Sequence, residues 1–73
     1  MTKESVQKLQ AAGYVFIRAR ETEGKGGKKY QSIFDSREFG VWKLLYKCET
    51  KAECKRKLDE LDADPMYILG ITN

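Results

Sequence analysis

The sequence has no histidine and only two cysteines among its 73 residues. Without histidine, the commonest general base and metal ligand of proteins is missing. A zinc site would need Cys48, Cys54 and carboxylates alone, and a cysteine nucleophile would have to come from positions that the pattern assigns to the core. We therefore expect no metal, no cofactor and no enzyme activity.

Long apolar segments are also missing. The longest uncharged run, residues 66–73, is far shorter than the ~20 apolar residues that cross a bilayer. The start, Met1 to Ser5, is charged and has no apolar region behind it, so it does not have the pattern of a signal peptide. Two cysteines do not form the disulfide framework of a small secreted domain. We expect a cytoplasmic protein without membrane contact, folded as a single domain over residues 1–73.

The clearest local pattern is the stretch from Gly40 to Glu53. Its first half alternates, which predicts a strand with one buried face: Trp42, Leu44, Tyr46 and Cys48. Thr50 and Glu53 then have the spacing of a capping box, in which the Thr hydroxyl accepts from the Glu N–H and the Glu carboxylate reaches back to the Thr N–H. The strand should end at residue 48 or 49, and a helix should follow directly.

The rest of the chain supplies the other elements. A first helix is predicted from Thr2 as the N-cap to about residue 12, ended by Gly13. Aromatic and β-branched residues predict strands over 14–20 and 29–35, joined by a glycine-rich turn, with residues 35–38 as a second turn. The second helix should cover 51–61 with Cys54, Leu58 and Leu61 buried. Residues 66–71 are predicted as an edge strand, with a packed tail as the alternative.

These elements predict an α+β fold of two layers. Three sequential strands with short connections form an antiparallel meander, because a parallel return needs a long crossover. Both helices are expected on one face of the sheet, in the order α-β-β-β-α with a possible fourth strand. The opposite sheet face would then be free for a partner.

The free face is the first candidate site. With Val15 and Ile17 turned inward, the outward positions combine aromatic rings with cations, which suits base stacking and phosphate contact: Tyr14, Phe16, Arg18, Arg20, Lys43 and Lys47. The alternative is that Tyr14 and Phe16 only cover neighbouring strands.

The turn Gly24-Lys25-Gly26-Gly27-Lys28-Lys29 is the second candidate. Glycines can free backbone N–H groups for a phosphate, and Lys25, Lys28 and Lys29 surround them. The alternative is a solubilising loop. The charge distribution supports a phosphate site in this turn. Residues 1–30 carry seven basic and three acidic residues, whereas residues 31–73 carry seven basic and eight acidic residues.

The predicted element order is similar to that of double-stranded-RNA-binding domains, and its three strands with the second helix are similar to arm-type DNA-binding domains of integrases. This resemblance is one of topology and assigns no residues. We expect a non-enzymatic module that binds DNA or RNA through the phosphate backbone. The alternative is a protein-interaction module, either a small regulator or inhibitor or a homodimer, that uses the same face or the apolar C-terminal segment.

Overall fold

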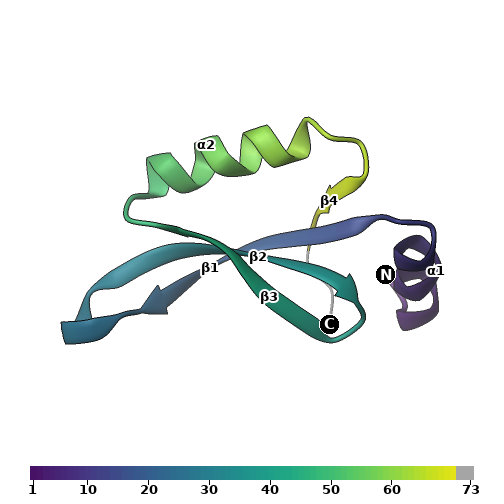
Figure 1. The fold of residues 1–73 in the computed structure, drawn as a ribbon, viewed down its shortest axis with the longest axis horizontal. Helices are drawn as coiled ribbons and strands as arrows, with labels where there is room; N and C mark the ends of the chain where they lie inside the picture. The colour runs from purple at the N-terminus through teal and green to yellow at the C-terminus, as the bar shows by residue number, and fades with distance from the viewer. Residues whose placement is uncertain (71–73) are drawn as a thin grey trace.

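The computed structural model describes residues 1–70 and shows an α+β fold with two helices and a four-stranded mixed sheet (Figure 1). The elements are α1 (Lys3–Ala11), β1 (Val15–Glu23), a short 3-10 turn η1 (Lys25–Gly27), β2 (Lys29–Glu38), β3 (Val41–Cys48), α2 (Lys51–Asp62) and β4 (Tyr67–Leu69). No helix in this part of the chain has the length and apolar character needed to cross a membrane.

The sheet has the order β3-β2-β1-β4. Strands β1, β2 and β3 form the predicted antiparallel meander. The predicted fourth strand is confirmed at Tyr67–Leu69, where it pairs in parallel with β1 from Val15 to Ile17. A parallel pair needs a long crossover, and here α2 carries the chain from the β3 edge of the sheet to the opposite edge. The end of the predicted segment, residue 71, lies outside the described residues.

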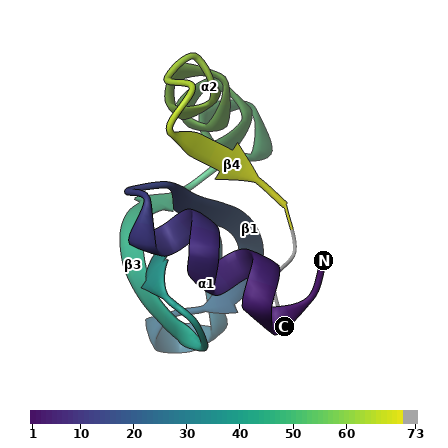
Figure 2. The ribbon, with the colours of Figure 1, turned by 90° about the vertical axis from the view of Figure 1, so that its right-hand side faces the viewer.

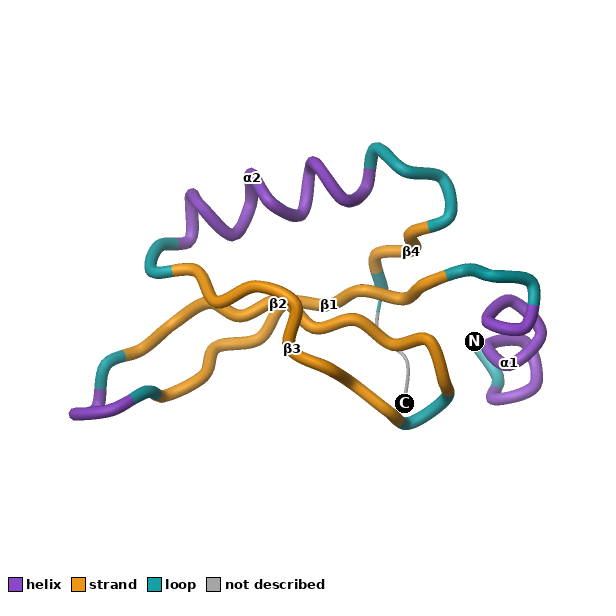
Figure 3. The backbone as a smooth tube through the Cα atoms, in the orientation of Figure 1, coloured by secondary structure: helices purple, strands orange, loops and turns teal. Residues whose placement is uncertain are grey.

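The β1–β2 hairpin is longer than its apolar residues predict. It runs in continuous register from Phe16 opposite Ser36 to Glu23 opposite Lys29, and it ends in η1, beyond the start of α2 (Figure 3). Residues 35–38, expected in a turn, belong to β2, because the ladder with β1 continues through residues 35 and 36 and Glu38 pairs with Val41 of β3. Polar pairs support the outer half, where Thr22 and Ser32 share a hydroxyl hydrogen bond of 2.7 Å.

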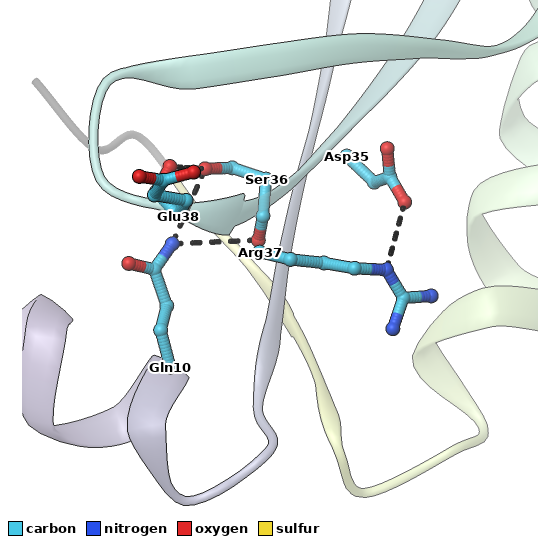
Figure 4. A network of polar contacts seen from close by, with 5 residues as sticks. All are labelled: Gln10, Asp35, Ser36, Arg37 and Glu38. Carbon is cyan, nitrogen blue, oxygen red and sulfur yellow. Dashed lines mark hydrogen bonds and ion pairs between the residues drawn. The ribbon is translucent and has the colours of Figure 1, made fainter.

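The prediction that both helices cover one face of the sheet is not confirmed. Ile33 packs in a buried cluster with residues of α2. Three positions further along β2, and therefore on the other face, the Ser36 hydroxyl accepts from Gln10 of α1 at 3.2 Å (Figure 4). The end view shows α2 above the sheet and α1 at its end, away from α2 (Figure 2). Hydropathy stripes predict that a helix packs, but they do not say on which face.

The sequence predicted the start of α2 almost completely. The Thr50 hydroxyl accepts from the Glu53 N–H at 3.1 Å. The Glu53 carboxylate accepts from the N–H of Glu49 at 3.3 Å, one residue before the expected donor. Behind this cap Cys54, Leu58 and Leu61 face the sheet as predicted.

Cys48 and Cys54 lie together in the cluster beneath α2, and both are buried free thiols. Burial raises the pKa of the Cys54 thiol, and its contact with Cys48 raises it further. The folded protein therefore favours the neutral thiol more than the unfolded chain does. This contribution to stability is complete below the ordinary thiol pKa of about 8.5 and is lost as the pH rises above it.

We accordingly expect the free energy of unfolding to fall as the pH is raised above about 8.5. Urea titrations at increasing pH measure this fall. In Cys54→Ala the protein should be less stable at neutral pH but should lose less stability on alkalisation, because one titrating group is gone. An unchanged alkaline loss in Cys54→Ala would show that the thiol does not cause it.

Candidate functional site

One face of the sheet turns away from α2, and we call it the open face. Alternate positions of three strands form it. Four cross-strand pairs of β1 and β2 lie on it: Phe16 with Ser36, Arg18 with Phe34, Arg20 with Ser32, and Thr22 with Tyr30. Strand β3 adds Leu44 opposite Phe34 and Lys47 opposite Ser32. Trp42 joins them, since the Arg18 guanidinium lies over its ring. Helix α1 occupies only the end of this face, beside Ser36.

A β-bulge decides which residues of β3 belong to the open face. Ile33 pairs with Tyr46, but the next residue, Phe34, pairs with Leu44, so Leu45 has no partner of its own. The extra residue reverses the alternation on its N-terminal side. As a result Leu44 and Trp42 reach the open face instead of the face beneath α2.

The bulge overturns two predictions made from strict alternation. Trp42 and Leu44, predicted on the buried face, lie on the open face instead, and Leu44 is 55% exposed. Tyr46 and Cys48 keep the predicted face beneath α2, although Tyr46 is 37% exposed. Lys43 lies opposite Asp35, on the side of the sheet away from Arg18 and Arg20, and is not part of the open face. The two adjacent leucines, Leu44 and Leu45, break the apolar–polar alternation of the strand and are the sequence signal of this bulge.

The strand positions that form the open face carry three cations and no carboxylate. Its charged residues are Arg18, Arg20 and Lys47. Within residues 1–70, none of the three lies within 4.0 Å of a carboxylate oxygen, whereas Lys28, Lys29, Arg37 and Lys55 each have an acidic partner. The face therefore has an uncompensated positive charge.

Arg18 is the most constrained of these cations. Its guanidinium carbon lies 4.0 Å from the centre of the Trp42 ring. Its Nε is buried and has no acceptor among the described residues. Burial lowers the pKa of Arg18, and the charge of Arg20 lowers it further, although arginine stays protonated.

The ring contact of Arg18 and the cost of its buried Nε are of similar size. A cation–π contact contributes about 0.5–2 kcal/mol. A buried donor without an acceptor costs about 1–3 kcal/mol, and more when the group is charged. The ring and the missing acceptor thus nearly cancel, and an anion that offers an acceptor would stabilise Arg18.

Cations also lie over the ring of Tyr30, at the other end of the open face. The Lys47 ammonium lies 4.7 Å from its ring centre, and that of Lys28 lies 5.3 Å away. A side chain at Gly24 would collide with this ring, so a substitution there would force Tyr30 to move. At least one loop glycine therefore has a structural role.

Two of the three glycine N–H groups in the loop already have acceptors within it. The N–H groups of Gly24 and Gly27 donate within the loop, to the carbonyl groups of Lys28 and Gly24. Lys28 pairs with Glu49 at 3.3 Å, and this contact raises the pKa of Lys28. Lys29 pairs with Glu21 at 3.3 Å. Lys25 is exposed at the tip, outside the open face.

Of the two predicted stacking aromatics, Phe16 is buried and Tyr14 lies outside the strands. Phe16 points in the predicted direction but is only 1% exposed, at the end of the face occupied by α1. Tyr14 precedes β1, and it is half-buried in the turn after α1. The rings on the open face are instead Trp42, Phe34 and Tyr30, all half-buried.

No other site competes with this face in the described part of the chain. A depression of about 170 Å³ is lined by Asp35, Arg37, Glu38, Val41 and Lys43, which is small for a ligand pocket. Within residues 1–70, no three His, Cys, Asp or Glu side chains are grouped so that they could hold a metal ion.

The fold and the open face define this chain as a small α+β protein with a cationic sheet surface. Comparisons with protein-family models, curated proteins and solved structures found no match. The case for a function depends on the geometry alone.

Proposed function

We propose that this protein is a non-enzymatic module that binds nucleic acid through the phosphate backbone, using the open face. The observation that supports this best is the set of three cations without a carboxylate on an exposed sheet surface. Phosphate contacts by arginine and lysine supply most of the sequence-independent affinity for nucleic acid. The cytoplasmic location predicted from the sequence is part of this proposal.

The spacing of the cations suits a chain of phosphates. Arg18 and Arg20 are two residues apart on one strand face, which separates their backbones by about 6.6 Å. Lys47 lies in the same cross-strand row as Arg20, about 10 Å away across the two strand spacings. A phosphodiester backbone that crosses the face can therefore contact more than one cation.

The binding set is revised from the one that the sequence predicted. Arg18, Arg20 and Lys47 form its centre. Lys28 and Lys29 already have acidic partners, and Lys25 is a peripheral cation at the loop tip. Lys43 is left out because the bulge turns it to the other side.

Binding should depend steeply on salt. With three phosphates neutralised, the slope of log affinity against log salt should be about −2.7 for duplex DNA and about −2.1 for a single strand. Between 50 mM and 200 mM salt this corresponds to a loss of affinity of about 40-fold and about 20-fold, respectively. Fluorescence anisotropy of a labelled oligonucleotide measures it. An affinity that does not respond to salt would refute backbone binding.

A protein-interaction function is the second candidate, and exposed apolar residues on β3 favour it. Val41, Leu44 and Tyr46 are 41%, 55% and 37% exposed on an edge strand of the sheet. Apolar side chains on a sheet edge are typical of contact surfaces. A stable dimer in light scattering, without a gel shift on DNA or RNA, would favour this candidate over the first.

A further inference from the structure

We propose that Arg18 and Trp42 make the open face selective for single-stranded nucleic acid: a phosphate draws Arg18 from the indole ring, and a base stacks on the ring face that Arg18 leaves. This inference depends on the proposed nucleic-acid function and adds the class of ligand. It requires Arg18 to cover the ring in the free protein, and the guanidinium carbon lies 4.0 Å from the ring centre.

The first step follows from the environment of Arg18. In the free protein its Nε is buried without an acceptor, and no carboxylate in residues 1–70 forms an ion pair with it. Arg20, two positions along the same strand face, repels it. A phosphate oxygen supplies both the acceptor and the negative charge that this environment lacks. Arg18 therefore gains by turning from the ring toward a bound phosphate.

The second step follows from the ring that is uncovered. Trp42 is half-buried and Arg18 covers one face of its ring, so the departure of Arg18 frees that face. Phe34 and Leu44 lie beside it in one cross-strand row with Arg18, and they extend the apolar surface. Base stacking on an aromatic ring tolerates any sequence, since every base has a π-face.

A single strand is the ligand that can both contact Arg18 with a phosphate and stack a base on Trp42. In a duplex the bases are stacked inside the helix, so a duplex offers phosphates to Arg18 but no free base to Trp42. A single strand carries a phosphate and an unstacked base on the same nucleotide. The second cation-covered ring, Tyr30 beneath Lys47 and Lys28, repeats the arrangement at the other end of the face.

The test uses the fact that Trp42 is the only tryptophan. The protein is titrated with a short oligodeoxythymidylate, with an abasic oligonucleotide of equal length, and with a duplex. We expect the thymidylate to quench the fluorescence of Trp42 and to bind about tenfold more tightly than the abasic strand, the effect of one stacked base. The abasic strand and the duplex should bind without comparable quenching.

Variants separate the two roles. Arg18→Gln should weaken the thymidylate and the abasic strand by equal factors, because it removes a phosphate contact but leaves the ring. Trp42→Leu should abolish the preference for thymidylate over the abasic strand, because the stacking ring is gone, and Trp42→Phe should keep most of the preference. Lys43→Gln, on the other side of the sheet, is the control and should change neither affinity. Circular dichroism confirms that each variant is folded.

The outcomes distinguish the two proposals. Equal binding of all three ligands without quenching would overturn the selectivity for single strands and leave backbone binding intact. The same conclusion would follow if the wild-type preference for thymidylate persisted in a folded Trp42→Leu protein. No binding of any of the three at low salt would overturn the proposed function together with this inference.

Discussion

Phe16→Ala should remove a large part of the free energy of unfolding, although Phe16 has the sequence context of an exposed stacking residue. Its side chain is 1% exposed and lies on the sheet face beside α1. Truncation of a buried phenylalanine costs about 3–5 kcal/mol. A domain of this length has a total stability of only about 4–11 kcal/mol, so the loss removes a large part of it. Urea denaturation followed by circular dichroism measures the change.

Tyr14→Ala and Phe34→Ala are the matched controls for Phe16. Both side chains are half-buried, and because the cost of truncation follows burial, each variant should lose less stability than Phe16→Ala. If Phe16→Ala kept the stability of the wild type but lost affinity for nucleic acid, Phe16 would be a contact residue after all and the placement of α1 would be wrong.

Neutralisation of two cations on the open face, Arg20→Gln with Lys47→Gln, should reduce affinity for nucleic acid about 100-fold at low salt. Each contact of a cation with phosphate contributes roughly 1.5 kcal/mol, or about tenfold in affinity. The salt slope should fall from about −2.7 to about −0.9 for duplex DNA, because only Arg18 remains of the three. Anisotropy titrations at several salt concentrations give both quantities.

The control for charge is a second double variant, Lys43→Gln with Lys51→Gln. It removes the same net charge from an exposed residue beyond the bulge and from the first position of α2. If the affinity depends on the open face, this variant should bind within about twofold of the wild type, the small effect of distant charges screened by salt. Equal losses in the two double variants would show that total charge, and not the open face, controls binding.

Several local features could be predicted because they depend on neighbouring residues. The cap of α2 at Thr50 formed as its spacing indicated. The buried stripe of α2 was correct, and so was the antiparallel order of the three long strands. Short connections and side-chain periodicity determine these features, and both can be read from adjacent positions in the chain.

The candidate site was predicted only in part, since it depends on distant residues. Arg18, Arg20 and Lys47 lie on one open face as expected. Phe16 is also on this face, but its burial at the α1 end could not be known before the helix was placed. The aromatic residues that do reach the surface were missed, because Trp42 was assigned to the core by an alternation that the bulge interrupts.

The sequence by itself determined the α+β class, the order of the elements and the concentration of positive charge near the first hairpin, because propensity, periodicity and composition are local properties. Only the tertiary structure decided which side chains share a surface. The bulge at Leu45 turned Trp42 and Leu44 toward Arg18, and the docking of Gln10 on Ser36 placed α1 away from α2. A shift of one residue in a strand exchanges its two faces. Which side chains lie on which face therefore depends on how the strand pairs with its neighbour.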